Sequence, residues 1–513
     1  MKTQMTGKTK QRLFLVLALL IALLSAVNFF YNISEYPLQN MDEARHGVNA
    51  YEMVKTGELT ATTYGYEYDY WNVKPPLSSW MIAAGYRIFG FGTLGLRFYS
   101  ALSGVALTVA VMLAARRFYG RQVSLCSGVI FAAVPRLSFI NGFSLRFGDP
   151  NGLFYLLYFL CIFCLMLSVK RTKFFPLAVL AASLALLDKG AHALTAFAAL
   201  FFVWLFFRLF QRMRAADYLL SAAALLPVGV WAVFRYLEDG AEFFTRMVTI
   251  DLFNRVTTVV ENHTGGGLGP LFYLKTILDD NKILFAGLFV LLLLSVIILL
   301  AVKRKKVFSA LKAGLEPRRE TWVLWLGLLI PLLLFSVSQS KIDRYIYPVY
   351  SVLAILAARW LVAIFRALRE NRVALAAAAM VCVAMFLGNE GFILSQYRGE
   401  IYIPEYETAV KQVSAEYETS GRLLYCTYKR VDDPDIEVPR AFSGWTQSVL
   451  FAGELYADFI PTEGGEEAFL ASAPGSYLMA PVEDLSGSSV LKENAGEYRV
   501  CFTGEYLVIL QKV

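Results

Sequence analysis

The chain has 513 residues, of which 57% are hydrophobic, and its formal net charge is +7. A water-soluble domain is about 45–50% apolar, so this composition excludes an ordinary soluble protein. The apolar residues fall in runs of about 15–22 residues, the length that a helix needs to cross a hydrocarbon layer about 30 Å thick. Because the basic residues cluster in short loops between these runs, the positive charge does not indicate nucleic-acid binding, and no nucleic-acid partner is expected.

The apolar runs predict an all-α polytopic membrane protein with about eleven transmembrane helices. The expected spans are residues 12–32, 94–115, 122–140, 151–169, 174–187, 191–207, 215–236, 282–302, 321–338, 345–365 and 373–392. The first run is followed by Tyr, Pro and acidic residues rather than by a small-residue cleavage site, which predicts a retained helix. Every second loop is basic, such as residues 116–121 and 366–372, and basic loops face the cytoplasm. We therefore expect a multi-pass protein of the cell (inner) membrane with a cytoplasmic N-terminus and an extracytoplasmic C-terminal region.

The composition changes after the last apolar run. Short apolar segments now alternate with Gly, Pro and acidic residues, a pattern typical of strands and turns. The segment YRVCFTGEYLVILQ predicts a hairpin that turns at Thr503–Gly504–Glu505. We expect a membrane region over residues 1–392 and a small α/β or α+β extracytoplasmic domain over residues 393–513. In that domain, Cys426 and Cys501 either form a disulfide or stay free thiols.

The first outer loop, residues 33–92, has a pattern of its own. Asn40 and Glu43 have the spacing of a capping box, and apolar residues recur at helical spacing up to Gly57. This pattern predicts an amphipathic helix that lies at the membrane surface. The stretch TYGYEYDYWNVKPPLSSW follows it. Tyr and Trp at this density are typical of the headgroup level of a membrane, and also of a surface that stacks against sugar rings.

Charged residues gather at the start of this predicted helix. Asp42, Glu43 and Arg45 lie within four positions, and Lys74 follows in the same loop. A carboxylate at such a place can act as a general base while neighbouring cations hold an anion. Helix electrostatics also explain the acids, because the helix dipole favours negative charge in the first turn. Both explanations stay open from the sequence alone.

Further charged residues precede two of the expected spans. Asp149 lies before the fourth span, Lys341 and Arg344 lie before the tenth, and Tyr345 begins the tenth. On the expected topology Asp149 faces the same compartment as Asp42, so the two carboxylates are expected to meet at one wet cavity, which ionisable residues at membrane depth usually line. Asp149 is also explained as a helix start. Lys341 and Arg344 either grip a lipid phosphate or anchor the helix end at the interface.

Five short motifs occur in order along the chain. They are Asp-Glu-x-Arg from Asp42, Lys-Pro-Pro-Leu from Lys74, the single acid Asp149, Lys-Gly from Lys189, and Ser-x-x-Lys-x-x-x-Tyr-x-x-Pro from Ser338. Together they resemble the integral-membrane GT-C glycosyltransferases that use polyprenyl-phosphate sugars, in particular the bacterial protein-mannosyltransferase-like branch that includes the aminoarabinose transferases. The resemblance covers most of the membrane region, and the C-terminal domain adds no motif to it.

The resemblance implies roles for these residues. Asp42 becomes the base that takes the proton of the acceptor hydroxyl, and Asp149 becomes a second acid of the active site. Glu43 is a third candidate for the catalytic group. Arg45 and Lys74 become ligands of the lipid phosphate, and the tenth-span residues named above (Lys341, Arg344, Tyr345) are further candidates for that contact.

The chain departs from the family pattern at one position. Family members often carry Glu immediately before Lys-Pro-Pro, and here that position is Val73. In the aminoarabinose-transferase branch this Glu helps to bind a metal together with a His in a later outer loop, to which His263 corresponds at best by position. With Val73 one metal ligand is missing, so we expect no metal and no other cofactor.

These observations predict a hexosyl or pentosyl transferase. It is expected to move a monosaccharide from a polyprenyl-phosphate donor to a hydroxyl of a lipid, glycan or protein acceptor at the outer face, by an inverting single displacement. Two alternatives stay open. A multi-span transporter or flippase of a lipid-linked sugar or polymer would place charged residues inside several spans. A non-catalytic partner that binds lipid-linked sugar would keep the aromatic loop without needing Asp42.

Overall fold

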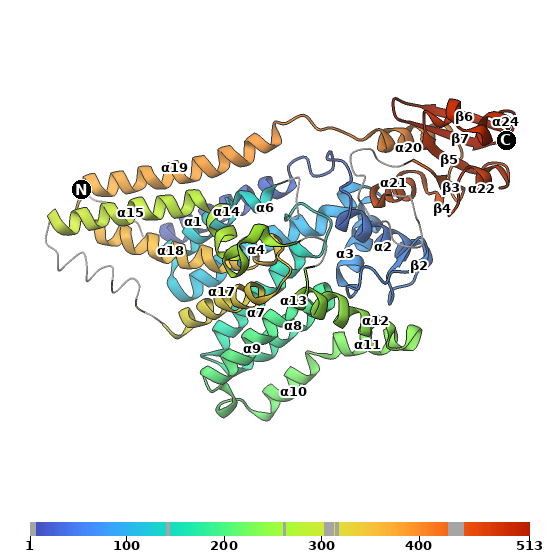
Figure 1. The fold of residues 1–513 in the computed structure, drawn as a ribbon. Helices are drawn as coiled ribbons and strands as arrows, with labels where there is room; N and C mark the ends of the chain where they lie inside the picture. Colours follow the sequence, from blue (N-terminus) through green and yellow to red (C-terminus); the bar gives the residue numbers. More distant parts are fainter. Residues whose placement is uncertain are drawn as a thin grey trace. The chain divides into compact units, whose positions relative to one another are not determined.

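The computed structural model describes residues 7–139, 144–259, 263–301, 312, 316, 318–428 and 446–513 (Figure 1). The chain forms two compact units, each built from two segments. The first, which we call the membrane unit, combines Met1–Tyr31 with Ser100–Gly399. The second, which we call the loop unit, combines Asn32–Tyr99 with Glu400–Val513. The first outer loop therefore packs with the C-terminal segment of the chain.

The membrane unit is built of helices. These are α1 (Gly7–Phe30), α5 (Arg121–Ala132), α6 (Pro135–Ser138), α7 (Asn151–Ser168), α8 (Phe175–Lys189), α9 (Leu194–Phe206), α10 (Ala215–Ala223), α11 (Leu226–Asp239), α12 (Glu242–Arg246), α13 (Arg255–Thr257), α14 (Phe272–Asp280), α15 (Lys282–Ala301), α17 (Arg319–Val337), α18 (Val349–Leu368) and α19 (Arg372–Tyr397). Helix α4 (Thr93–Tyr119) begins in the loop unit and continues into the membrane unit. Helices α15, α18 and α19 run side by side (Figure 1), and α1 packs against α5.

The predicted class, an all-α polytopic membrane protein, is confirmed. Among the described residues, eight helical stretches are long and apolar enough to cross a membrane, and a ninth is formed if α14 and α15, bent by 77° at their junction, count as one span. The number eleven is not confirmed. The run 122–140 gives the 12-residue helix α5 and the four-residue helix α6 instead of one span, because Val134, the residue before Pro135, is extended, as proline favours. The two expected spans 174–187 and 191–207 correspond to α8 and α9, which form one continuous apolar stretch, Thr172–Phe206, and count once.

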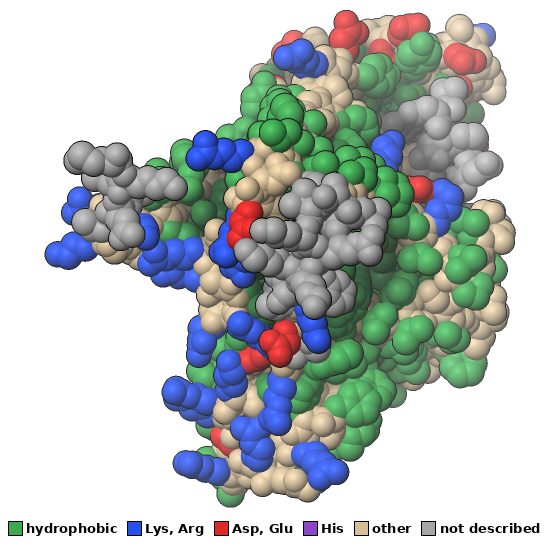
Figure 2. All heavy atoms as spheres, turned by 90° about the vertical axis from the view of Figure 1, so that its left-hand side faces the viewer, with side chains coloured by type: hydrophobic (Ala, Val, Ile, Leu, Met, Phe, Trp, Pro, Cys, Tyr) green, Lys and Arg blue, Asp and Glu red, His purple; other side chains and the backbone are tan. Residues whose placement is uncertain are grey.

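Basic loops lie together at one end of the membrane unit. Arg116 and Arg121 both donate to the side-chain oxygen of Gln11 in α1, at 3.4 and 2.5 Å. Arg366 at the end of α18 donates to Gln122 at 3.1 Å. Figure 2 looks toward the end from which the chain starts, and Lys and Arg side chains are numerous on this face. The predicted gathering of basic loops is therefore present, and its cytoplasmic orientation stays a prediction.

The loop unit contains a mixed sheet with helices around it. Its elements are α2 (Asp42–Thr56), β1 (Thr63–Tyr64), β2 (Glu67–Tyr68), α3 (Leu77–Phe89), α20 (Glu405–Glu416), β3 (Leu423–Cys426), α21 (Gln447–Ala457), β4 (Ile460–Pro461), α22 (Glu466–Leu470), β5 (Tyr477–Pro481), α23 (Asp484–Gly487), α24 (Ser489–Glu493), β6 (Tyr498–Thr503) and β7 (Leu507–Lys512). The sheet order is β4-β3-β5-β7-β6, with β4, β3 and β5 parallel and β5, β7 and β6 antiparallel. The predicted small mixed α and β domain is thus confirmed.

The hairpin predicted near the C-terminus is also present. Strands β6 and β7 pair antiparallel, and the Gly504 N–H donates to the Leu507 carbonyl at 2.9 Å across the turn. Phe469, Leu478 and Leu510 lie in the fully buried core of this sheet. Cys426 and Cys501 are free thiols, so of the two possibilities in the sequence the disulfide is not formed.

Helix α2 forms where the sequence predicts a helix, and it ends at Gly57, whose φ of 79° is the left-handed conformation that glycine adopts easily. The predicted capping box is wrong. Met41, and not Asn40, is the N-cap residue, its side chain makes no capping hydrogen bond, and the Asn40 side-chain oxygen accepts the Ser448 N–H at 3.1 Å. The expectation that this helix lies at the membrane surface stays a prediction. Residues 43–53 are all buried, since α3 and α21 both pack against α2.

Candidate functional site

The most buried ion pair of the first outer loop joins Arg45 and Asp69. Arg45 is 2% exposed, and its Nε and Nη2 donate to the two carboxylate oxygens of Asp69 at 2.7 and 2.5 Å. The guanidinium also lies 4.3 Å from the ring centre of Tyr64 and 4.5 Å from that of Trp71. Burial by itself raises the pKa of Asp69, but Arg45 and hydrogen bonds from Asn72 outweigh it, so the pKa lies below its ordinary value. These contacts favour a structural role for Arg45.

A second buried ion pair holds Glu43. The Glu43 carboxylate accepts from Nε and Nη2 of Arg97 at 2.8 and 2.7 Å, and from the Gln39 N–H at 2.9 Å. Arg97 also donates to the carbonyls of Tyr36 and Pro37 at 2.9 and 2.7 Å. This network ties the chain before α2 to the start of α4. It favours positioning rather than direct catalysis for Glu43.

Asp42 and Lys74 lie beside the same imidazole, that of His46. Both side chains are half-buried, and both are close enough to His46 to affect its ionisation. Burial lowers the pKa of His46 to about 4, while Asp42 opposes this shift and Lys74 adds to it. The ring is therefore neutral near pH 7. Two of the predicted site residues, 32 positions apart in sequence, thus share one neighbour.

Amide side chains hold this imidazole in place. The Asn72 amide nitrogen lies 3.2 Å from Nδ1 of His46 and donates to the Asn49 side-chain oxygen at 2.8 Å. Asn49 in turn donates to Asp69 at 3.0 Å. The sequence placed His46 inside the charged motif but gave it no role, and it gave none to Asn72 or Asp69. For Asp69 and Asn72, the one feature of the sequence that could have pointed to a role is their position in the aromatic stretch that follows α2.

A separate polar cluster in the membrane unit contains Asp149. Asp149 is 1% exposed, and its carboxylate accepts the Asn151 N–H at 2.9 Å and also contacts the Asn151 amide. The Asn151 side-chain oxygen in turn accepts from the ammonium of Lys189, which is 5% exposed. This chain of contacts joins the start of α7 to the end of α8. Asn151 was missed in the sequence because an amide after Asp-Pro is also an ordinary helix start.

Tyr345 and Arg344 lie near this cluster. The Lys189 ammonium is 5.8 Å from the centre of the Tyr345 ring. The Tyr155 hydroxyl donates to the Arg344 carbonyl at 3.1 Å, and both Asp149 and Arg344 interact electrostatically with that hydroxyl. Four of the sequence-selected residues, Asp149, Lys189, Arg344 and Tyr345, are thus brought together.

Lys341 has a different environment. Its ammonium donates to the carbonyls of Ser336 and Phe335 at 2.7 and 3.2 Å, and also to that of Ser338. These are the last carbonyls of α17, which have no partner within the helix. Lys341 therefore caps this helix end. Its predicted role in phosphate binding stays a prediction that these contacts do not favour.

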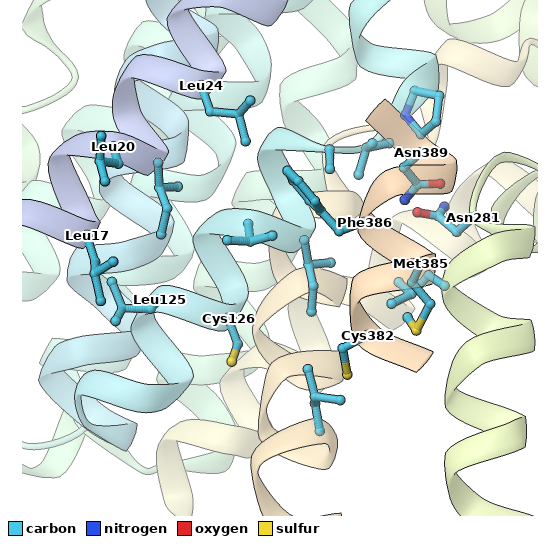
Figure 3. Close-up of a pocket in the computed structure, with 18 of the residues that line it drawn as sticks. Leu17, Leu20, Leu24, Leu125, Cys126, Asn281, Cys382, Met385, Phe386 and Asn389 are labelled. Atoms are coloured by element: carbon cyan, nitrogen blue, oxygen red, sulfur yellow. The ribbon is translucent and has the colours of Figure 1, made fainter. Parts of the chain in front are cut away.

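An apolar groove of about 440 Å³ opens in the membrane unit (Figure 3). The residues that line it include Leu17, Leu20 and Leu24 of α1, Leu125 and Cys126 of α5, and Cys382, Met385 and Phe386 of α19. Asn281 and Asn389 lie next to each other at one end (Figure 3), close to Asp280. Among the described residues that line the groove there is no Lys or Arg. Its surface therefore suits a hydrocarbon chain rather than a phosphate.

Asp42 and Asp149 belong to different compact units. That they meet at one cavity stays a prediction. Within its own unit, Asp149 is linked to Lys189 through Asn151, and Asp42 and Lys74 both act electrostatically on His46.

Comparisons with known proteins show which families the chain resembles. Residues 73–234 match the family model described as dolichyl-phosphate-mannose-protein mannosyltransferase. An uncharacterized protein of Aquifex aeolicus is 28% identical over 349 residues, which cover 67% of this chain and 63% of that protein. The undecaprenyl phosphate-alpha-4-amino-4-deoxy-L-arabinose arabinosyl transferase of Pseudomonas aeruginosa is 25% identical over 353 residues, 66% of this chain and 59% of the relative. The chain thus spans about three fifths of the length of these relatives.

A solved structure extends the similarity to the whole chain. ArnT from Cupriavidus metallidurans bound to undecaprenyl phosphate has a TM-score of 0.67 at 18% identity, with 99% of each chain covered. At this level of identity the match shows the fold alone. The chain therefore has the fold of this transferase. Together with the family-model match and the curated relative, this fold confirms the resemblance to the GT-C glycosyltransferases that use polyprenyl-phosphate sugars.

Proposed function

We propose that the chain is a glycosyltransferase that moves a monosaccharide from a polyprenyl-phosphate donor to a hydroxyl of a lipid, glycan or protein acceptor at the outer face of the membrane. The observation that carries the proposal is that Asp42 and Lys74 both act electrostatically on the same buried, neutral His46, within motifs that resemble those of such transferases. A base and a cation are the two groups that this reaction requires.

Asp42 is the proposed base. It is the first residue of α2, where the helix dipole favours the carboxylate form that a base needs. A carboxylate held this way is a weak base, so its contribution comes mainly from position. The neighbouring imidazole adds no positive charge, because His46 is neutral near pH 7. Glu43, held by Arg97, fixes the turn of helix from which Asp42 projects.

Lys74 is the proposed ligand of the donor phosphate. The leaving group is a polyprenyl phosphate, whose second pKa is about 6, so it departs without protonation by an acid. It requires positive charge instead, and the half-buried Lys74 supplies one. A base with a cationic clamp differs from the acid–base pair of water-using glycosidases. Attack from the face opposite the phosphate inverts the anomeric carbon in one displacement.

In the membrane unit, Asp149 and Lys189 are proposed to act as a pair. Asp149 orients Asn151, which holds the Lys189 ammonium. Arg344 and Tyr345 lie beside this cation and are proposed as further contacts for an anionic or sugar group. The apolar groove lined by α1, α5 and α19 is proposed to hold a hydrocarbon chain of a lipid substrate.

The test is transfer in vitro. Purified protein in vesicles is given a panel of polyprenyl-phosphate sugars and extracted envelope fractions, and transferred sugar is measured. We expect one donor to be used, and we expect Asp42→Asn to abolish transfer because an amide cannot accept the proton. The matched control is Glu67→Gln, the same acid-to-amide change at an exposed position of β2. Full transfer by the Asp42→Asn variant would remove Asp42 from the role of base.

A transporter or flippase of lipid-linked sugar is the second candidate. Two buried charged residues inside helices favour it. Arg359 lies midway along α18 and donates to Thr321 at 2.9 Å, and Glu390 in α19 accepts from Asn28 at 3.2 Å. Ionisable residues within transmembrane helices often mark transport pathways. A flippase would move fluorescent polyprenyl-phosphate sugar across the vesicle membrane equally well in the wild type and in the Asp42→Asn variant, and would transfer no sugar.

A further inference from the structure

Helix α21, in the C-terminal segment of the chain, packs against helix α2. At the start of α2, Asn40 accepts the Ser448 N–H at 3.1 Å. At the middle, the Phe451 ring lies so close to Gly47 that a Cβ on Gly47 would be 2.1 Å from it. Both helices belong to the loop unit. The residue with which α2 begins is Asp42, so whatever holds α2 also positions the proposed base.

The end of α2 is held by Asp458, which follows α21. The Tyr51 hydroxyl donates to the Asp458 carboxylate, and the Lys55 ammonium forms an ion pair with it at 2.7 Å. Lys55 is also 5.6 Å from the centre of the Tyr51 ring. These contacts are partly exposed, so each is worth little alone. They bring the ends of the two helices into register.

A buried pair of carboxyl groups lies between these contacts. Glu52 of α2 and Glu454 of α21 are both 0% exposed, and their side chains are within hydrogen-bonding reach of each other. One oxygen of Glu52 accepts the Tyr66 N–H at 3.0 Å. Among the described residues, the other oxygen of Glu52 and both oxygens of Glu454 meet no hydrogen-bond donor. Two such carboxylates would repel, whereas one shared proton supplies the missing donor.

Burial favours the protonated form of the pair, whereas hydrogen bonds from Thr63, Gly65 and Tyr66 to Glu52 oppose it. The groups facing it are Tyr51 and Lys55 of α2, Tyr64 of β1, Tyr66 of the β1–β2 turn, Tyr86 of α3 and Asp458 after α21. Burial raises the pKa of Glu52 to about 7 and also raises that of Glu454, to which Glu52 adds a further rise. Lys55 opposes the shift, but it already pairs with Asp458.

We propose that the proton shared by Glu52 and Glu454 is a pH-sensitive latch, which holds α2 against α21 and thereby keeps Asp42 in place. The proposal rests on the proposed function of Asp42, and it gives the C-terminal segment a role in regulating that site. When the proton is lost, two buried negative charges face each other and the contact between the helices weakens. Glu52 and Glu454 are positioning residues, since they act on the reaction through α2.

The direction of the pH effect follows from the raised pKa values. The ordinary pKa of Glu52 is 4.5, and in the folded protein it lies near 7. The folded state keeps a proton that the separated helices would release, so the latch contributes fully below pH 4.5. Its contribution is lost as the pH rises through the neutral range. Transfer should therefore decline on the alkaline side.

The first experiment needs no enzymatic activity. Amide hydrogen exchange of full-length protein is followed by mass spectrometry between pH 6 and pH 9, with rates corrected for intrinsic exchange. Peptides from α2 are compared with peptides from α20 (Glu405–Glu416) as an internal reference. We expect protection of α2 to fall relative to α20 as the pH rises in the wild type, and to stay constant in Glu52→Gln. The Gln amide donates to Glu454 at every pH, so it replaces the shared proton.

The second experiment is the pH profile of sugar transfer. We expect the wild type to lose up to about tenfold in rate for each pH unit above its midpoint, as one ionisation allows, and Glu52→Gln to lose this alkaline limb. Glu454→Gln is the mirror variant, in case the first variant folds poorly, and Glu67→Gln is the control that keeps the limb. An unchanged alkaline limb in folded Glu52→Gln protein, or exchange in α2 that tracks α20 at every pH, would overturn the latch. Loss of transfer under all conditions with a pH-dependent α2 would refute the proposed function and leave the latch standing.

Discussion

Asp42 and Glu43 are neighbours in sequence with different environments. Glu43 is fully buried in an ion pair with Arg97, whereas Asp42 is half-buried beside His46 and Lys74. Sequence reasoning selected both acids, because it reads residue type and spacing. It had no means of telling them apart, since the partner of Glu43 lies 54 positions further along the chain.

His46 leads to a prediction about protonation. Its pKa of about 4 means that the ring stays neutral from pH 5.5 to pH 8. The chain has three histidines, so NMR of labelled histidine is readable, and His46→Asn assigns the signal. We expect no titration of that signal in this range. The neutral ring contributes to the free energy of unfolding fully above pH 6.5, and the contribution is lost as the pH falls toward 4. A midpoint near 6.5 would show that His46 is not buried as described.

Lys74 leads to a prediction about donor use. A hydrogen bond to a charged group contributes about 1.5–3 kcal/mol, so Lys74→Gln should lower kcat/KM for the donor by roughly ten- to hundredfold. Steady-state kinetics with varied donor concentration measures the effect. Arg87→Gln is the control, because it removes one positive charge from an exposed position of α3 in the same unit. Equal kinetics for the two variants would contradict phosphate binding by Lys74.

At the scale of elements, the sequence predicted those whose pattern is local. Helix α2 up to Gly57 and the hairpin turning at Gly504 follow from periodicity and turn residues. The capping box failed because the Asn40 side chain bonds to Ser448, 408 positions away. The single span over 122–140 failed because Val134, before Pro135, is extended. A long-range hydrogen bond thus prevented the predicted capping box, and one proline interrupted the predicted span.

The packing of α2 on α21 leads to a prediction about stability. In an isolated helix, Gly→Ala stabilises by about 1 kcal/mol. Here Gly47→Ala should instead lower the Tm, because the new Cβ would meet the Phe451 ring. Thermal unfolding of the detergent-solubilised protein measures it. In the Phe451→Ala background the same change should cost much less, since the clash is gone. Additive effects of the two substitutions would mean that these side chains are not in contact.

At the scale of the whole molecule, the sequence predicted two regions that follow one another along the chain. The contacts instead form two units, each of which combines two segments that are far apart in sequence. Residues 32–99 pack with residues 400–513 in one unit, so the first outer loop and the C-terminal segment share a core. Glu407 of α20 accepts the Leu38 N–H at 2.6 Å, which is one of these long-range contacts. No local sequence pattern predicts the contact between Leu38 and Glu407, because these two residues are 369 positions apart.

The candidate site was predictable to the extent that its charged residues stand in recognisable motifs. Motif order selected Asp42, Lys74, Asp149 and Lys189, and each lies in a polar cluster of its own unit. The amides and the imidazole that orient them carry no charge near pH 7. Their roles emerged only from contacts such as that of Asn151 with Lys189.

The most direct test of the account separates donor binding from chemistry in Asp42→Asn. A donor labelled in both its sugar and its polyprenyl chain is incubated with wild-type and variant protein in vesicles, and bound donor and transferred sugar are counted in the same sample. We expect the variant to bind donor like the wild type and to transfer none of its sugar, and we expect the wild-type product to have an inverted anomeric carbon. Transfer by the variant at the wild-type rate, or a wild-type product with retained configuration, would contradict it.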